Sequence, residues 1–327
     1  MMRRLFIVLA AAMILLSACA PGGGEASTSA PTTSSAGAEQ SAQGTCTFTD
    51  SLGNTVELEQ PPKRVAALLG SYAETWLLAG GEVVAVTQDA YDERGLELPE
   101  DTVNLGANQQ PDLEALFAAE PDLVLLTPDL DGQMGLRDSL EAAGIPAAWF
   151  KVETFDDYLN MLKICTDLTG RSDLYQKNGL DIQSEIDAAI ASVPEGEAPT
   201  VLLLRAYSSG VRAKNSDNIA GAILKDLGAA NIADSDSGLL EDLQMESILA
   251  ADPEFIFVTT MGASQEAALE SLDELLHSDP AWQTLTAVKE DRVEVLPKDL
   301  FHYKPNARWG ESYQMLAELM YLSLIHI

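Results

Sequence analysis

The sequence is poor in positive charge. It has 19 lysines and arginines against 51 aspartates and glutamates in 327 residues, which gives a formal net charge of −32. Proteins that bind nucleic acids use clustered lysine and arginine to neutralise phosphates, so this balance argues against a nucleic acid partner. It also supplies no polybasic patch for an anionic membrane surface. Any attachment to a membrane must therefore come from another feature.

Histidine and cysteine are also scarce, with three of each. A site for bare zinc or manganese needs several imidazoles, thiolates or carboxylates that converge on the ion, yet only His277 and His302 occur before residue 322. The chain has no glycine-rich phosphate loop, and GESYQ from Gly310 lacks the second glycine of a nucleophile elbow. We therefore predict no metal site, no cofactor and no catalytic residues. Two functions that would need such residues are kept as alternatives to the interpretation below: a receptor for zinc or manganese and, less favoured, a secreted hydrolase.

No apolar run reaches the roughly 18–20 residues that a membrane-spanning helix needs. The apolar stretch Leu5–Leu16 follows two arginines and continues into Leu-Ser-Ala-Cys, residues 16–19. This arrangement predicts a secretory signal peptide over residues 1–18. The cysteine after Leu-Ser-Ala resembles the bacterial lipobox. The resemblance implies that Cys19 becomes the lipid-modified first residue of the mature protein.

Two segments lie outside the predicted fold. Residues 19–44 consist almost entirely of glycine, serine, alanine, threonine and proline, and such a segment buries too little apolar surface to fold. We expect a flexible tether that spans roughly 25–30 Å. At the other end, residues 322–327 (LSLIHI) have no helix cap and no polar face. We interpret them as a non-native tail.

With Cys19 lipidated, Cys46 and Cys165 are left as an even pair. In an oxidising compartment two such cysteines can form a disulfide. They can equally remain separate reduced thiols, because spacing in the sequence does not supply the geometry that a bridge needs. The sequence leaves both possibilities open.

Strand-like and helix-like patterns alternate over residues 45–153 and again over 199–321, which predicts two lobes with mostly parallel sheets. Residues 154–198 show no strand pattern and predict a helical connection. It includes one long helix that begins after Ser172 as its cap, with Gly179 as a weak point. The predicted fold class is therefore α/β, with two lobes joined by a single long α-helix.

One unit occurs twice in this order of elements. LEALFAAEPDLVLLT (Leu113–Thr127) and MESILAADPEFIFVT (Met245–Thr259) both read as a helix, an acid-Pro-acid turn and a strand. Glu114 and Glu246 occupy the same position in the two copies. An acidic residue in the first turn of a helix is stabilised by the helix dipole, so both glutamates have an ordinary structural explanation. The repetition favours a shared function.

Ligands of α/β lobes bind beyond the carboxyl ends of the strands, which selects a set of loops that would face a cleft. The stretch after Lys298 is rich in aromatic and basic side chains, which suit a large ligand with anionic edges. The candidate ligand-binding residues from these loops are Ser71, Tyr72, Tyr91, Tyr207, Arg212, Lys214, Met261, Tyr303, Lys304, Arg308 and Trp309.

The lipobox, the tether, the two lobes and the single long helix together resemble the class III periplasmic binding proteins. These are the iron–siderophore, haem and cobalamin receptors of ABC importers, and a zinc or manganese receptor shares their plan. The resemblance implies a monomeric, lipid-anchored receptor on the extracytoplasmic face of the cell membrane. It also implies that Glu114 and Glu246 dock on a permease dimer. The basic residues favour a ferric siderophore, but the sequence does not decide among siderophore, haem and cobalamin.

Overall fold

The computed structural model describes residues 44–322 apart from 197 and 263, and the backbone alone at 322. The predicted signal peptide, the lipidation site Cys19, most of the tether and residues 323–327 lie outside the described residues. Within the described ranges, no helix combines the length and the apolar character that crossing a membrane requires.

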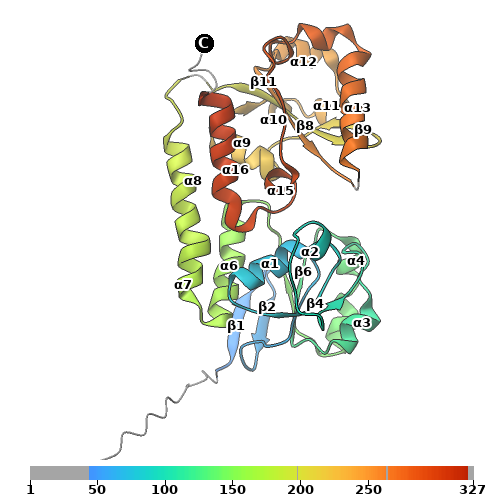
Figure 1. Cartoon of the computed structure of the whole chain (residues 1–327), viewed down its shortest axis with the longest axis vertical. Coiled ribbons are helices and arrows are strands. Elements are labelled where there is room, and N and C mark those ends of the chain that lie inside the picture. The colour runs from blue at the N-terminus through green and yellow to red at the C-terminus, as the bar shows by residue number, and fades with distance from the viewer. Residues whose placement is uncertain (1–43, 197, 263, 323–327) are drawn as a thin grey trace, which may run out of the picture. The chain divides into compact units, whose positions relative to one another are not determined.

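The N-terminal lobe begins with an antiparallel hairpin and continues with alternating strands and helices (Figure 1). Its elements are β1 (Cys46–Thr49), β2 (Thr55–Leu58), β3 (Val65–Ala67), α1 (Gly70–Leu78), β4 (Val83–Val86), α2 (Asp89–Asp92), β5 (Val103–Asn104), α3 (Leu113–Ala118), β6 (Leu123–Leu126), α4 (Asp131–Met134), α5 (Arg137–Ala142) and β7 (Ala147–Trp149).

Five of these strands form one parallel sheet in the order β5-β4-β3-β6-β7. The strands are apolar on both faces because both faces are covered, as is usual for parallel sheets. The predicted hairpin is present as β1 and β2. The Asp50 carboxylate in its turn accepts the N–H of Asn54 at 2.8 Å and the N–H of Trp149 at 3.2 Å. This one side chain therefore ties the hairpin to the end of β7.

The C-terminal lobe repeats the alternation of strands and helices. Its elements are β8 (Thr200–Tyr207), β9 (Gly210–Ala213), α9 (Ile219–Asp226), β10 (Ala230–Asn231), α10 (Ile232–Ser235), α11 (Gly238–Glu241), α12 (Met245–Ala251), β11 (Phe255–Thr260), α13 (Gln265–Ser278), η2 (Pro280–Thr284), α14 (Thr286–Lys289), β12 (Val293–Val295), α15 (Lys298–Phe301), η3 (Asn306–Arg308), α16 (Trp309–Ala317) and η4 (Glu318–Leu322).

The second sheet is parallel in the order β10-β8-β11-β12, with β9 paired antiparallel to β8. The sequence predicts a loop where β9 lies. The structure instead extends β8 to Tyr207 and returns the chain through Gly210, whose φ of 132° suits glycine. This hairpin places Arg212 beside Arg205 of β8.

The connection between the lobes contains α6 (Phe155–Thr169) and a long helix made of α7 (Ser172–Tyr175), the π-helical segment η1 (Gln176–Leu180) and α8 (Asp181–Ala191). The predicted cap is wrong: Arg171 is the N-cap, and Ser172 makes no capping hydrogen bond. The predicted weak point at Gly179 lies inside η1. There the Tyr158 hydroxyl donates to the Asn178 carbonyl at 2.8 Å, so an outside donor satisfies part of the irregular turn.

One hydrophobic core runs from the first sheet through the connecting helices to the second sheet. Val65 and Leu125 contribute from the N-terminal lobe, Ile186 from α8, and Leu203 and Phe257 from the C-terminal lobe. Helix α16 packs along α8, and the two run side by side in Figure 1. The opposite face of each sheet has a core of its own. The two lobes are thus held by a shared interior rather than by a loose linker.

The two cysteines are free thiols. Cys46 is partly buried at the start of β1, and Cys165 is buried in α6. The disulfide that the sequence left open is therefore not formed, and the alternative of separate thiols holds. Burial in apolar surroundings raises the pKa of the Cys165 thiol to about 12, which keeps it protonated and unreactive.

The repeated acid-Pro-acid turns have the same backbone conformation and the same kind of hydrogen bond in both lobes. In each turn the acid before the proline has a positive φ, 47° at Glu120 and 40° at Asp252. The acid after the proline then binds the neighbouring strand. Asp122 accepts the N–H groups of Lys63 and Arg64 at 2.8 Å each.

The second copy has the same arrangement. Glu254 accepts the N–H of Thr200, the first residue of β8, at 3.2 Å, and donates its own N–H to the Thr200 carbonyl at 2.9 Å. The carboxylate after the proline thereby fixes the start of the adjacent strand. This part of the repeat is explained by folding alone.

Replacing Asp122 with alanine should lower the free energy of unfolding by about 1–2 kcal/mol, because two hydrogen bonds to one carboxylate are lost. Guanidinium denaturation of the two proteins measures the difference. Glu114→Ala, at an exposed position of the same repeated unit, is the matched control and should change stability by less than about 0.5 kcal/mol. Equal stability of the Asp122 variant and the wild type would contradict the structural role.

Candidate functional site

The carboxyl ends of both sheets meet the segment between α15 and α16, and together they form what we call the interlobe surface. Residues 302–306 of that segment, here called the bridging segment, reach the N-terminal lobe. The Asn306 side chain donates to the Ser71 carbonyl at 2.9 Å and to the Glu74 carboxylate at 2.6 Å. Glu74 also pairs with Arg94. Asn306 is 1% exposed and has a φ of 54°, so the contact is buried and the backbone turns sharply there.

Two further residues of the bridging segment contact the N-terminal lobe. The Tyr303 hydroxyl lies near the Glu93 carboxylate, and burial together with that carboxylate raises the pKa of Tyr303 to about 12. The Lys304 ammonium lies 5.8 Å from the centre of the Tyr72 ring. Both predicted ligand residues therefore lie at the interlobe surface, and both also hold the lobes together.

The C-terminal lobe presents five cations at this surface. Within the described ranges none of them forms an ion pair with a carboxylate, although the chain is strongly acidic. The five residues are Arg205, Arg212, Lys214, Lys298 and Lys304.

The sheet explains why three of these cations lie together. Arg205 and Arg212 are directly opposite each other on β8 and β9. Lys214 follows two residues later on the same side, and its N–H donates to the Leu203 carbonyl at 2.8 Å. Like charges opposite one another destabilise a sheet. The pairing of β8 with β9 therefore places three positive charges close together on one side of the hairpin.

The interlobe surface also contains His302, which is half-buried. Its ring lies 5.4 Å from that of Tyr303 and makes no hydrogen bond with the described residues. Partial burial, together with Arg205, Lys298 and Lys304, lowers the pKa of His302 to about 4. The imidazole is therefore neutral at neutral pH.

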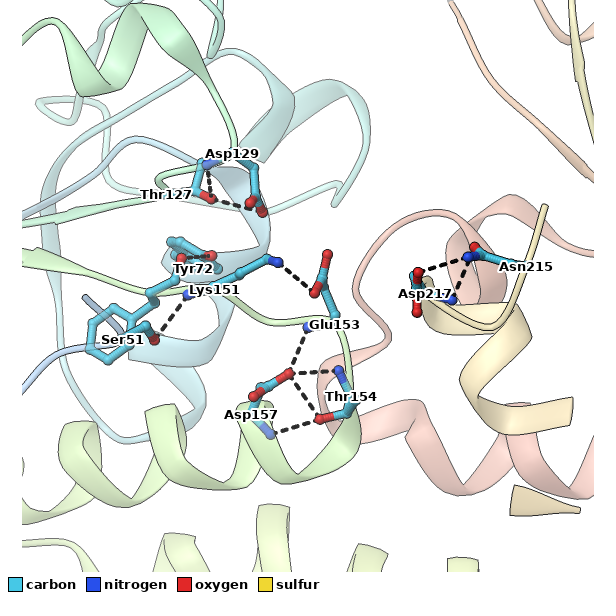
Figure 2. A network of polar contacts seen from close by, with 11 residues as sticks. Ser51, Tyr72, Thr127, Asp129, Lys151, Glu153, Thr154, Asp157, Asn215 and Asp217 are labelled. Carbon is cyan, nitrogen blue, oxygen red and sulfur yellow. Dashed lines mark hydrogen bonds and ion pairs between the residues drawn. The ribbon is translucent and has the colours of Figure 1, made fainter. Parts of the chain in front are cut away.

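The N-terminal lobe presents acidic and polar side chains instead, shown in Figure 2. Lys151 pairs with Glu153 at 2.8 Å. Asp129 is held by the Thr127 hydroxyl at 3.2 Å, and Asp157 closes the capping box of α6. The attraction of Asp129 and Glu153 for Lys304 partly offsets the burial that lowers the pKa of that lysine. The N-terminal lobe thus adds carboxylates to the surface on which the C-terminal lobe supplies the five cations.

Three predicted ligand residues are occupied by local packing or pairing. Trp309 is fully buried and packs against Phe155 with ring centres 6.2 Å apart, so it belongs to the shared core. Tyr72 is 1% exposed and donates its hydroxyl to the Phe150 carbonyl. Arg308 is exposed but pairs with Asp299 at 2.5 Å and Glu311 at 2.8 Å. These positions lie in an aromatic and basic stretch of sequence, but local packing and pairing use their side chains.

Among the remaining predicted ligand residues, three side chains are at least partly exposed and one has a free hydroxyl. Tyr91 and Tyr207 are partly exposed, and Met261 is 39% exposed just after β11. Ser71 is 5% exposed, and its hydroxyl has no hydrogen-bond partner among the described residues. These four stay predictions, because no ligand is present to contact them.

Sequence reasoning missed two of the five cations. Arg205 is the only charged residue in the apolar strand TVLLLR, and it stands near the carboxyl end of β8, which was a usable signal. Lys298 begins α15, donates to the Gly262 carbonyl at 2.8 Å and lies 5.0 Å from the centre of the Tyr303 ring. Only the tertiary arrangement brings Lys298 to the other cations.

Glu114 and Glu246 occupy equivalent positions in the structure. Each is the second residue of its helix, α3 or α12, and each is exposed. Asp112, the cap of α3, donates its N–H to the carbonyl of Leu105, just after β5, at 2.8 Å. The first turn of α3 thus lies at the carboxyl end of its sheet. Glu114 is outside the bridging segment but at the same end of the lobe as the ligand loops.

Among the described residues, no group of three or more histidines, cysteines, aspartates or glutamates is placed to hold a metal ion. The alternative of a receptor for bare zinc or manganese therefore finds no set of ligands in this part of the chain.

Comparison with known sequences identifies relatives of this chain. Residues 65–300 match the profile of a family described as periplasmic binding protein. The chain is 27% identical over 256 residues to the Fe(3+) dicitrate-binding periplasmic protein FecB of Escherichia coli K12, covering 76% of this chain and 80% of that protein. It is 22% identical over 243 residues to the Fe(3+)-citrate-binding protein YfmC of Bacillus subtilis 168, covering 73% and 74%.

Solved structures share the fold. Staphylococcus aureus SirA complexed with staphyloferrin B matches with a TM-score of 0.64 and 22% identity, over 86% of this chain and 98% of that one. The periplasmic heme-binding protein HutB of Vibrio cholerae matches with a TM-score of 0.64 and 22% identity, over 79% and 98%. These likenesses establish the two-lobed architecture.

The pKa of His302 predicts how stability depends on pH. A histidine in an unfolded chain titrates near about 6.5, whereas folded His302 titrates at about 4. The unfolded state therefore binds more protons between these values, so stability should fall as the pH decreases through this window. Denaturation midpoints between pH 7.5 and 4.5 should decrease less steeply for His302→Gln than for the wild type. His277→Gln, at an exposed site on α13, is the control, and an unchanged slope in His302→Gln would disprove the assignment.

Proposed function

The chain belongs to the periplasmic binding protein family, and we propose that it is the receptor through which an ABC importer captures an anionic ferric chelate. Members of this family bind substrates and are not enzymes. The favoured ligand is ferric citrate or a siderophore with carboxylate groups. The relatives FecB and YfmC are named for Fe(3+) dicitrate and Fe(3+)-citrate, which supports this choice.

The observation that carries the proposal is the group of five unpaired cations on the C-terminal lobe. Other described cations, such as Lys177, Lys225 and Lys289, also lack a carboxylate partner, so the distinguishing feature of the five is that they lie together on one surface. Charge-assisted hydrogen bonds from such a group to carboxylates would stabilise an anionic ligand. Arginine in particular gives bidentate hydrogen bonds to carboxylates.

The buried aromatic residues narrow the choice of ligand. Tyr72 and Trp309 lie beneath the surface and offer no open aromatic face, which leaves only the partly exposed rings of Tyr91, Tyr207 and Tyr303 among the predicted ligand residues. A broad flat macrocycle such as haem would gain most from exposed aromatic rings. A corrinoid with amide arms would leave the cations uncompensated. A compact polycarboxylate chelate uses the features that the interlobe surface presents.

The transporter and the membrane anchor complete the proposal. Glu114 and Glu246, one on each lobe, would meet positive sites on the two halves of a permease dimer, since paired charges set the register of such a complex. The lipobox-like cysteine, Cys19, would anchor the receptor to the extracytoplasmic face of the membrane. We expect the receptor to act as a monomer, because each copy supplies both glutamates.

Replacing Arg212 with glutamine should weaken the binding of ferric citrate at least about tenfold, which corresponds to about 1.4 kcal/mol. The charge lost lies among cations that the ligand must compensate. Isothermal titration calorimetry at fixed pH measures the affinity. Lys225→Gln, an exposed lysine on α9, removes the same charge elsewhere and should change the affinity less than about twofold. Equal losses in both variants would mean that net charge, not the site, governs binding.

Replacing Glu114 or Glu246 with arginine should impair uptake of the ferric chelate and leave its affinity for the isolated receptor within about twofold. The double variant should transport less than either single variant, because each lobe has its own docking contact. Uptake of radioactive iron by cells and calorimetry on the purified proteins separate the two effects. Normal uptake by the double variant would refute docking, and lost binding in a single variant would place the ligand site near that glutamate.

A further inference from the structure

His302 is a half-buried histidine of the interlobe surface that lies among the cations of the C-terminal lobe. It stands at the start of the bridging segment. Its backbone N–H donates to the Lys298 carbonyl at 3.0 Å and continues the last turn of α15. Its ring has no hydrogen-bond partner within the described residues. The imidazole therefore has unused hydrogen-bonding capacity in a half-buried position.

The charges that act on His302 come from three elements. Arg205 lies on β8, Lys298 on α15, and Lys304 two residues further along the bridging segment. Across from the segment, Glu93 of the N-terminal lobe raises the pKa of Tyr303 but is not among the groups that shift the pKa of His302. The histidine is thus surrounded by positive charge, without an acid to balance it.

A bound anion changes this balance. Its carboxylates would neutralise the same cations that disfavour the imidazolium, and a nearby negative charge favours the protonated ring directly. Both effects act in one direction, because the ligand brings the missing counter-charge. Water that remains around the chelate is the source of the proton.

We propose that His302 takes up one proton from solvent when an anionic chelate binds between the lobes, so that the imidazolium becomes a further cation of the loaded site. This inference rests on the proposed binding of an anionic ferric chelate. It makes capture a proton-linked reaction: one chelate and one proton bind together, and both leave together. His302 then discriminates among ligands, since only a ligand with enough negative charge recruits the proton.

The number of protons taken up and the resulting change in affinity follow from the two pKa values of His302. If the bound anion restores the pKa of His302 to the ordinary value of about 6.5 or above, the bound site carries about 0.9 proton more than the empty site at pH 5.5. The affinity should then be about tenfold higher at pH 5.5 than at pH 7.5 on account of His302 alone. The receptor would hold its cargo most tightly in acidic surroundings.

The test is isothermal titration calorimetry of the receptor with ferric citrate at pH 5.5, in two buffers with different ionisation enthalpies. The dependence of the observed enthalpy on the buffer gives the number of protons taken up. The chelate has its own protonation, but wild type and His302→Gln share it, so the difference between them isolates the histidine. We expect the wild type to take up about 0.9 proton more than His302→Gln.

Two further measurements make the result specific. His277→Gln removes the other histidine of the described chain, which lies exposed on α13 and hydrogen-bonds the Asp273 carbonyl at 2.8 Å, and it should take up as many protons as the wild type. Gallium(III) citrate, which is diamagnetic, allows the His302 ring signals to be titrated by NMR with and without ligand. The pKa of His302 should be higher in the loaded protein.

The outcomes separate the inference from the function on which it rests. If the wild type binds ferric citrate but shows the same proton uptake as His302→Gln, the proton linkage is wrong and the receptor function stands. If the NMR pKa of His302 is the same in the empty and loaded protein, the linkage is likewise refuted. If the wild type binds no ferric citrate between pH 5.5 and 7.5, both the proposed ligand and the linkage fall.

Discussion

The shared hydrophobic core is the constraint on which the other features depend. Two separate sheets would each bury their faces independently and would leave their orientation to a linker. Here residues as distant in sequence as Val65 and Phe257 belong to one interior that also includes α6, α8 and α16. Because packed interiors deform little, the carboxyl ends of both sheets are held toward one another. The shared core therefore fixes the interlobe surface.

The bridging segment converts this rigid frame into a polar site. Asn306 locks the segment to α1, and Tyr303 and Lys304 contact the N-terminal lobe. The same segment carries His302 beside the cations of the second sheet. One short stretch of chain thus holds the lobes together and places a histidine beside the cations, so substitutions there affect both the contact between the lobes and the charge of the interlobe surface.

The repeated helix–turn–strand unit combines two roles at different positions. The acids after the prolines, Asp122 and Glu254, hold the start of a neighbouring strand through backbone hydrogen bonds. Glu114 and Glu246 are exposed and make no such contact with the strands. Folding accounts for the turn, whereas the exposed glutamates remain available for a partner.

The sequence by itself determined the two α/β lobes, the parallel sheets and the helical connection, because the alternation of apolar strands and amphipathic helices is a local property. It also indicated Arg212, Lys214 and the stretch after Lys298 as candidates, since basic residues are scarce in this chain. The tertiary structure decided which of these side chains lie at the interlobe surface. Burial took Trp309 into the core, and the pairing of β8 with β9 brought Arg205 to Arg212. Burial and pairing depend on segments far apart in the chain, so no local pattern contains them.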